Sequence, residues 1–382
     1  MPDSVLPLPA LVSTPEQLAA LVHDLEAAPV VAVDTESNSL FAYWEQVCLI
    51  QFSTPGGDGV GTDYLIDPLA LPDLSPLGPL FANPDQQKIF HAAEYDIICL
   101  KRDYGFEFNH IFDTMVAART LGWPQVGLGP ILETHFGVKT DKKYQRANWG
   151  HRPLTLEQLD YARRDTHYLC ALKDQLTADL LAAGRLEEAQ EEFARLTQVR
   201  AGETAPTPEA FWQITGARDL PPYQAAVLRE VYWYREQQAQ HANHPPFKVM
   251  SGQTLLEIAQ RCPRHVDDLR GITGMTPSQL RRHAAGLLKA VQHGLAAPPP
   301  RTPTPLAEPD DVRERYERLR QWRKQKAQGR GVESDVIVPR EALRELAQRA
   351  PRTLDELCDI GPLGPWRRKL YGEEILKVLE GK

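Results

Sequence analysis

Two stretches in the C-terminal half of this chain have nearly the same sequence, and this duplication limits the folds open to it. LLEIAQRCPRHVDDL begins at Leu255 and LRELAQRAPRTLDEL begins at Leu343, while YREQQA at Tyr234 aligns with WRKQKA at Trp322 in the same register. A repeat period this long indicates a duplicated small domain and not a solenoid, whose units are shorter. Strand patterns nearly vanish after about residue 180, so we expect both copies to be all-helical.

Two proline-containing segments separate these copies from the rest of the chain and from each other. AGETAPTPE covers residues 201–209 and AAPPPRTPTPLAEP covers residues 296–309. Such segments favour an extended, semi-rigid spacer. The chain has 382 residues, more than one hydrophobic core usually organises. We therefore predict three domains, at residues 1–195, 210–295 and 310–382.

The N-terminal half alternates short β-rich runs with helical patterns, which predicts an α/β layer structure. Strands are expected at residues 30–33, 47–52, 64–66 and 88–90. Apolar residues at helical spacing predict helices at residues 15–26, 94–104, 114–121 and 156–176. Thr155 and Gln158 form the capping-box pattern that begins the last of these helices.

The composition indicates a soluble protein of ordinary charge. The net charge of -8 argues weakly against a protein that coats nucleic acid, although a local basic groove is compatible with it. No apolar run approaches the roughly 20 residues of a membrane span, and the N-terminus lacks the pattern of a secretory signal. Five cysteines without metal-site spacing are interpreted as reduced thiols packed in cores. We expect a cytoplasmic location, no membrane partner and no obligate protein partner.

A pair of carboxylates ends the first predicted strand. The segment VVAVDTES places Asp34 and Glu36 two residues apart, so both side chains project to the same face. Two ionised carboxylates this close are unfavourable unless a cation lies between them, and Mg²⁺ or Mn²⁺ prefers such oxygen ligands. The alternative is a strand that ends in a polar turn.

Two later motifs add carboxylates to this pair. Asp96 lies near the start of a predicted helix, just after the strand that ends at Phe90, where its alternative role is to complement the helix dipole. Tyr161 and Asp165 are four residues apart, so their side chains share one face of a helix. Taken alone, this last pair is more often an ordinary surface Tyr and Asp.

In their order and separation these motifs resemble the DEDD exonuclease superfamily, with DTE as the first motif, HAxxxD as the second and YxxxD as the third. The chain is most similar to the ribonuclease D family, because VDTESNSL, FHAAEYD and LDYARRDTHYL precede two helical repeats that resemble HRDC domains. This resemblance implies an α/β exonuclease domain with a ribonuclease H-like mixed sheet flanked by helices. It also implies that two small all-α HRDC bundles follow this domain.

The resemblance also implies the roles of individual residues. Asp34, Glu36, Asp96 and Asp165 would bind two divalent metal ions, Mg²⁺ or Mn²⁺. Tyr161, which selects the DEDDy subclass, would align the attacking water. Relatives have a His five residues before the last Asp, whereas this chain has Asp160 there, so His167 is assigned no catalytic role.

The activity implied by the resemblance is that of a hydrolytic 3′-to-5′ exoribonuclease. Its substrate would be RNA with a single-stranded 3′ end, especially tRNA precursors, and its products would be nucleoside 5′-monophosphates. The same carboxylates serve DNA exonucleases, so DNA stays an alternative substrate. A catalytically idle scaffold that binds nucleic acid through its C-terminal repeats is the alternative from another class of protein.

Basic side chains interleaved with aromatic ones are the candidates for nucleic-acid binding. One group precedes the helix of Tyr161, and the other lies in the basic run from Arg313 to Arg330. A solvated loop and an amphipathic helix with a charged outer face are the respective alternatives. The candidates are Lys142, Lys143, Arg146, Trp149, Arg152, Arg320, Arg323 and Lys324. Phe41, Tyr43 and Trp44 are alternatives for the ring that contacts the terminal base.

Overall fold

A computed structural model describes residues 8–55, 61–139, 143–202, 206–303 and 309–381. The chain forms two compact units, each built from segments that are discontinuous in sequence. One unit contains residues 1–37, 47–202 and 307–382, so the second helical repeat belongs with the N-terminal domain. The other contains the first helical repeat, at 203–306, together with the loop at 38–46. The sequence did not predict this grouping.

A six-stranded mixed sheet forms the centre of the N-terminal domain, in the order β1-β4-β3-β2-β5-β6. β2 pairs antiparallel with β3 and parallel with β5. The strands are β1 Ala10–Val12, β2 Val30–Ser37, β3 Val47–Thr54, β4 Thr62–Ile66, β5 Gln87–Phe90 and β6 Ile111–Asp113. The four predicted strands are confirmed. The edge strands β1 and β6 were missed because three residues are too few to show an alternating pattern.

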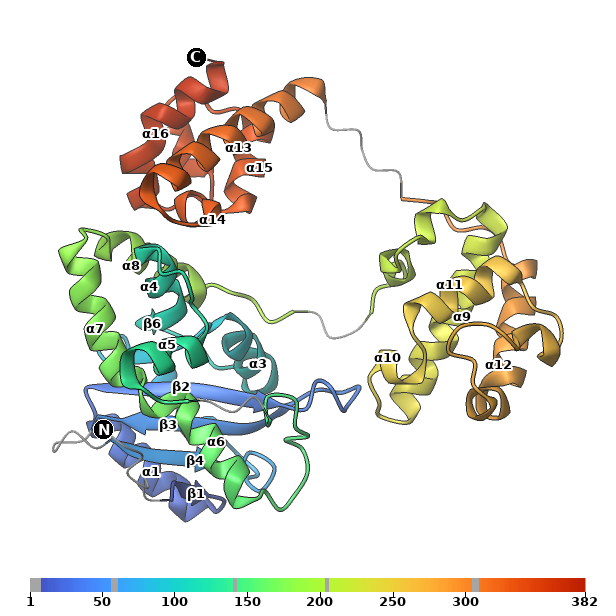
Figure 1. Ribbon diagram of the computed structural model, residues 1–382, viewed down its shortest axis with the longest axis horizontal. Coiled ribbons are helices and arrows are strands. Elements are labelled where there is room, and N and C mark those ends of the chain that lie inside the picture. The colour runs from blue at the N-terminus through green and yellow to red at the C-terminus, as the bar shows by residue number, and fades with distance from the viewer. Residues whose placement is uncertain (1–7, 56–60, 140–142, 203–205, 304–308, 382) are drawn as a thin grey trace. The chain divides into compact units, whose positions relative to one another are not determined.

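Helices cover both faces of this sheet, which confirms the predicted α/β architecture (Figure 1). On one face, α1 (Pro15–Ala27) and α3 (Glu94–Tyr104) share a core with Val33 and Ile50 of the sheet. Residues of the opposite face, such as Leu49 and Ile89, pack against a second set of helices. This set is α4 Thr114–Leu121, α5 Leu128–Phe136, α6 Leu156–His167, α7 Leu169–Ala182 and α8 Leu186–Thr197. The short α2 (Gly78–Ala82) completes the domain.

The helix predicted at residues 156–176 is two helices in the structure. Its start is as predicted, because the side chains of Thr155 and Gln158 each bond the other residue's backbone N–H. α6 ends at His167 and α7 begins at Leu169, with Tyr168 between them at φ -93° and ψ -5°. Neither Gly nor Pro occurs at this junction, so the sequence carried no signal for the break.

The two helical repeats have the same order of elements, which confirms the duplication. The first contains α9 Pro222–His241, α10 Pro246–Val249, α11 Gly252–Arg261 and α12 Pro277–Ala296. The second contains α13 Asp310–Arg330, α14 Ser334–Ile337, α15 Arg340–Arg349 and α16 Pro365–Glu380. Cys262 and Ala350 end α11 and α15 in the same left-handed conformation, with φ of 45° and 47°. The matching sequence stretches therefore form the same local structure.

Buried charge pairs attach the second repeat to the N-terminal domain within their common unit. Glu188 of α8 is fully buried and accepts two hydrogen bonds from the Arg330 guanidinium. Arg367 of α16 is 1% exposed and lies 2.6 Å from Glu191 and 2.8 Å from Glu192. Because Glu188 and Arg367 are removed from water, each depends on its charged partner for stability.

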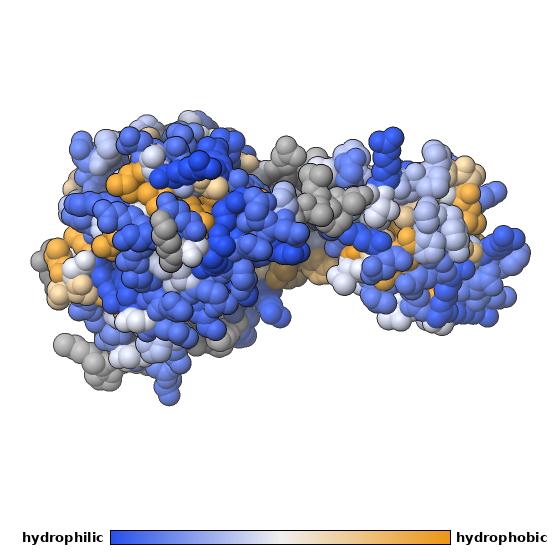
Figure 2. Space-filling view, turned by 90° about the horizontal axis from the view of Figure 1, so that it is seen from above, coloured by the Kyte–Doolittle hydropathy of each residue, from blue (hydrophilic) through white to orange (hydrophobic). Residues whose placement is uncertain are grey.

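On the face in view, Figure 2 shows mainly hydrophilic residues, with hydrophobic ones in separate patches between them. No helix among the described residues is both long enough and apolar enough to cross a membrane. Cys48 and Cys99 are buried, as predicted from the sequence. Cys358 is exposed, so the prediction that the cysteines pack in cores is wrong there.

Candidate active site

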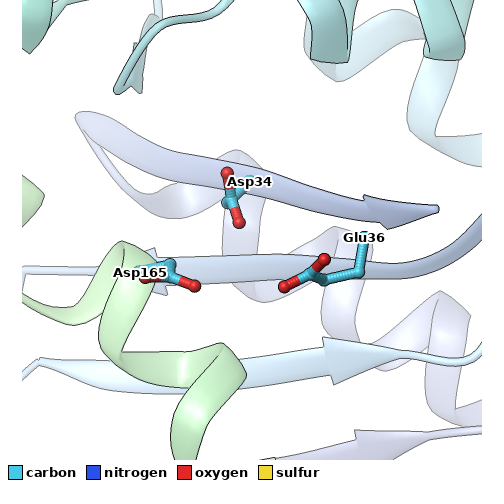
Figure 3. A group of neighbouring side chains, drawn as sticks. All are labelled: Asp34, Glu36 and Asp165. Carbon is cyan, nitrogen blue, oxygen red and sulfur yellow. The ribbon is translucent and has the colours of Figure 1, made fainter. Parts of the chain in front are cut away.

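Strand β2 and helix α6 bring three of the predicted carboxylates together. Asp34 and Glu36 point to the same side of β2, and Asp165 approaches them from α6 (Figure 3). One oxygen of each carboxylate lies within 4.8 Å of the others, and all three side chains are partly exposed. The two-residue spacing on a strand and the crossing of α6 over β2, β3 and β4 together produce this cluster.

Asp96, the fourth predicted carboxylate, lies beside this cluster in the first turn of α3. It is 6% exposed and accepts a hydrogen bond of 2.5 Å from the Thr35 hydroxyl. Its negative charge is close enough to raise the pKa of both Asp34 and Asp165. The structure thus places all four carboxylates in one electrostatic environment, with Asp96 turned toward Thr35.

Burial and mutual repulsion disfavour the charged forms of these carboxyls. Burial is the largest cause in each case and raises the pKa of Asp96 and of Asp165 to about 7. Burial, followed by repulsion from neighbouring carboxylates, holds the pKa of Asp34 and Glu36 well above their usual ranges. A divalent cation among these oxygens would compensate the negative charge, and an all-oxygen donor set is the kind that Mg²⁺ and Mn²⁺ prefer. The residues therefore fit a hard divalent metal ion.

In the metal-free protein we expect the free energy of unfolding to fall as the pH rises from about 4 to about 7. Asp96 and Asp165 have a pKa of about 7 in the folded protein, above the roughly 3.9 of Asp in unfolded chains. The folded state therefore binds more protons over this range, and stability is lost as they dissociate. Thermal unfolding in EDTA across this range measures the effect.

Asp165→Asn is the matched variant for this pH experiment, because it removes one of the four carboxyls whose pKa is raised while keeping the side-chain shape. Its unfolding temperature in EDTA should depend less on pH than that of the wild type. Saturating Mn²⁺ should make the unfolding temperature of the wild type depend less on pH, since the metal ion takes the place of the bound protons. An unfolding temperature that rises with pH in EDTA would contradict the assignment.

Tyr161 lies on α6, one turn before Asp165, as the sequence spacing predicted. Its ring centroid is 5.8 Å from that of Tyr144 and 6.1 Å from that of Trp149. Asp160, next to Tyr161, forms ion pairs with Arg163 and Arg164. The phenol is therefore on the same helix as a candidate ligand, with its ring against neighbouring aromatic side chains.

A buried hydrogen-bond network fixes α6 on the sheet. The Ser53 hydroxyl of β3 donates to Asp63 of β4 at 2.7 Å and lies 2.7 Å from the Thr166 hydroxyl of α6. His167 Nδ1 lies 2.9 Å from the same Asp63 carboxylate. His167 thus belongs to a structural network. The sequence did not reveal this network because its members come from three separate segments.

Two of the residues before α6 that were predicted to contact nucleic acid have structural roles instead. Trp149 is 1% exposed and packs in a core with Leu49, Leu65 and Ala162, so its ring is not available for base stacking. Arg152 forms an ion pair with Asp67 at 2.7 Å. It also donates to the carbonyls of Cys48 and Trp149.

The remaining candidates of that group are placed differently. Lys143 and Arg146 are exposed, and Lys143 Nζ lies 4.9 Å from the centre of the Tyr144 ring. Lys142 lies outside the described residues. A contact of Lys143 or Arg146 with phosphate stays a prediction.

The candidates on α13 also divide into structural and exposed side chains. Arg323 is half-buried and donates to the Val338 carbonyl at 2.9 Å. Arg320 is exposed and pairs with Glu317 at 2.7 Å, while Lys324 is exposed. Arg320 and Lys324 therefore stay predicted phosphate contacts, whereas Arg323 has a structural role.

The loop after β2 carries the three candidate rings for base stacking, and it packs within the unit of the first helical repeat. The Asn243 side-chain oxygen accepts from the backbone N–H groups of Tyr43 and Trp44, each at 3.1 Å. Lys248 Nζ lies 3.9 Å from the centre of the Phe41 ring. Tyr43 packs against the core of the repeat, whereas Trp44 is 53% exposed. Trp44 thus presents the largest free ring area of the three.

Comparisons with known proteins agree with this architecture. A family model described as a 3′-5′ exonuclease matches residues 9–181, and the HRDC domain model matches residues 224–291 and 312–379. Ribonuclease D of Nitrobacter hamburgensis is 31% identical over 97% of this chain and 95% of that protein. The exosome complex exonuclease RRP6 of Saccharomyces cerevisiae is 33% identical over 77% of this chain and 41% of that protein.

A solved structure is similar over nearly the full length. The crystal structure of Escherichia coli RNase D, described as an exoribonuclease involved in structured RNA processing, has a TM-score of 0.72 and 25% identity. The match covers 98% of this chain and 99% of that one. It extends over the sheet with its carboxylate cluster and over both helical repeats. The chain therefore belongs to the ribonuclease D family of 3′-to-5′ exonucleases.

Proposed function

We propose that this protein is a metal-dependent 3′-to-5′ exoribonuclease that trims single-stranded 3′ ends of structured RNA, especially tRNA precursors, in the cytoplasm. The observation that carries the proposal is the cluster of Asp34, Glu36 and Asp165, with Asp96 beside it, in a chain of the ribonuclease D family. The family matches at 9–181, 224–291 and 312–379 also support domain boundaries at 1–195, 210–295 and 310–382.

The four carboxylates would hold two divalent metal ions, Mg²⁺ or Mn²⁺. Such ions activate a water molecule and stabilise the charge on the leaving 3′ oxygen of an in-line displacement. The carboxylates would keep both ions in place while the terminal phosphodiester bond breaks and a nucleoside 5′-monophosphate leaves. The Tyr161 phenol would orient the attacking water through a hydrogen bond, because a phenol is a poor general base at neutral pH.

We expect Tyr161→Phe to lower the turnover number by roughly 10²-fold, the scale of a lost positioning or proton-transfer group. Metal binding should be nearly unchanged, since all four carboxylates stay in place. Single-turnover cleavage of a labelled RNA measures the first effect, and the rise of unfolding temperature with Mn²⁺ measures the second.

Tyr64→Phe, on β4, is the matched control for this experiment, because the Tyr64 hydroxyl donates to the exposed Asp24 at 3.3 Å. This variant should keep wild-type turnover and metal binding. If Tyr161→Phe lost metal binding, or if it cleaved RNA as fast as the wild type, the role of the phenol in orienting water would be wrong.

A 5′-labelled RNA with a structured body and a single-stranded 3′ tail tests the proposed function directly. With Mg²⁺ or Mn²⁺ we expect a descending ladder of products that stops at the structured region, and in EDTA no products. A parallel single-stranded DNA tests the alternative substrate. Preferential digestion of the DNA would favour a DNA exonuclease. Saturable RNA binding without metal-dependent products would favour the scaffold.

Two kinds of exposed side chain would contact the RNA outside the carboxylate cluster. Trp44 would stack on a base, an interaction worth about 1–3 kcal/mol per base. Lys143, Arg146, Arg320 and Lys324 would contact phosphates, so their replacement should weaken binding at low salt more than at high salt. The exposure of these five side chains is the observation that supports this assignment.

A further inference from the structure

Gln51 of β3 is a fully buried residue whose side chain has no hydrogen-bond partner among the residues that the structure describes. It is 0% exposed, and neither its amide nitrogen nor its amide oxygen is bonded to any of them. Leaving both polar atoms of a buried amide unsatisfied destabilises a folded protein, so native structures rarely do it without a reason. The position of Gln51 relative to the carboxylates suggests what that reason is.

The sheet register places Gln51 directly opposite Asp34. The two residues are partners in the antiparallel pairing of β2 and β3, so their side chains leave the same face of the sheet. Directly opposed residues have Cβ atoms about 4.5–5.5 Å apart. A glutamine side chain is long enough to reach across this distance to a carboxylate.

Contacts on both sides of Gln51 indicate that its side chain points toward the part of α6 that carries Asp165. Leu49, two residues before it, packs in one core with Ala162 of α6. Ser53, two residues after it, lies 2.7 Å from Thr166 of α6. Side chains alternate along a strand, so Gln51 points toward α6 between these two contacts. Asp165 lies between Ala162 and Thr166 in the sequence of that helix.

The Asp34 carboxylate lies among other carboxylates, since one oxygen each of Asp34, Glu36 and Asp165 lie within 4.8 Å of one another. Carboxylates that bind metals are themselves usually hydrogen-bonded by a second group, which fixes their orientation. Gln51 has an unused amide donor on the correct face of the neighbouring strand.

We infer that Gln51 is a positioning residue of the metal site, whose amide nitrogen donates a hydrogen bond to the Asp34 carboxylate when the cation is bound. This bond would fix which carboxylate oxygen faces the metal ion. The residue touches neither substrate nor the reacting phosphate, so it acts only through Asp34. The inference rests on the proposed function, because it requires metal binding at Asp34.

Gln51→Met tests the inference, because methionine matches the length of glutamine without its polar atoms. Titration with Mn²⁺, followed by electron paramagnetic resonance of the free ion, should show a dissociation constant about 10- to 100-fold higher than that of the wild type. The unfolding temperature in EDTA should be equal to or higher than that of the wild type, since two unsatisfied polar atoms are removed. Replacing a glutamine with a purely structural role would not weaken Mn²⁺ binding while leaving the stability in EDTA undiminished.

Gln86→Met is the matched control in the same domain. Gln86 is 4% exposed, and its amide nitrogen donates to the carbonyls of Leu25 and Ala28 at 2.6 and 2.7 Å. This variant should lower the unfolding temperature in EDTA and leave Mn²⁺ affinity unchanged. If Gln51→Met behaved in the same way, the inference would be overturned.

The experiment also separates this inference from the proposed function. If the wild type bound no Mn²⁺, or bound it equally well with Asp34→Asn, the proposed metal site itself would fail. If the wild type bound Mn²⁺ through Asp34 and Gln51→Met bound it with the same affinity, only the role of Gln51 would fail.

Discussion

Asp34→Asn should lower exonuclease activity by a factor on the order of 10³ or more, the scale seen when a central catalytic group is removed. Asparagine keeps the shape of the side chain but removes one negative charge from the cluster of Asp34, Glu36 and Asp165. A neutral amide oxygen is a weaker ligand for Mg²⁺ or Mn²⁺ than a carboxylate. Shortening of a 5′-labelled RNA, measured at saturating metal concentration, checks the effect.

The stability of the same variant should not fall with its activity. In EDTA, Asp34→Asn should unfold at the same or a higher temperature than the wild type, because burial and three nearby carboxylates disfavour the charged Asp34. Asp174→Asn, at a surface position paired with Lys173, is the control that should keep full activity. An inactive Asp34→Asn that also unfolds early would point to misfolding and not to lost metal binding.

Arg330→Met should lower the free energy of unfolding of the larger unit by about 3–5 kcal/mol, the usual effect of leaving one partner of a buried ion pair alone. Glu188 has no exposed surface, and Arg330 bonds both of its carboxylate oxygens. Without the guanidinium this carboxylate would have to be charged in a nonpolar environment or bind a proton. Urea unfolding followed by circular dichroism measures the change.

A second variant distinguishes the unpaired charge from a simple loss of contact. Combining Glu188→Leu with Arg330→Met removes both charges, and the stability should return close to the wild-type value. Arg320→Met, on the exposed side of the same helix, should leave the free energy of unfolding nearly unchanged, because exposed ion pairs contribute little. If Arg330→Met lowered the free energy of unfolding no more than Arg320→Met did, the attachment of the second repeat to α8 would not depend on the pair of Glu188 and Arg330.

Features of this protein that depend on near neighbours could be predicted from the sequence. The bounds of α3 and α4 match the prediction, because helical periodicity and end signals lie within each segment. The shared face of Asp34 and Glu36 follows from the two-residue repeat of a strand. The duplication was visible directly, and the two copies have the same left-handed helix end at Cys262 and Ala350.

The roles of charged and polar side chains depended on residues far away in the sequence. Lys143 and Arg152 are both basic residues of one segment, yet one is exposed and the other pairs with Asp67. Trp149 is of a residue type that can stack on bases, but its side chain lies in a hydrophobic core. A local pattern reports the type of a side chain and its face, whereas its partner is decided by how distant segments pack.

The sequence by itself determined the α/β domain, the two helical repeats and the four carboxylates that define the candidate site. Only the tertiary structure decided that the second repeat joins the N-terminal unit and that Gln51 faces Asp34 from the next strand. The physical reason is the range of the interactions. Periodicity and capping act within a few residues, while buried ion pairs and strand register join residues that the sequence keeps far apart.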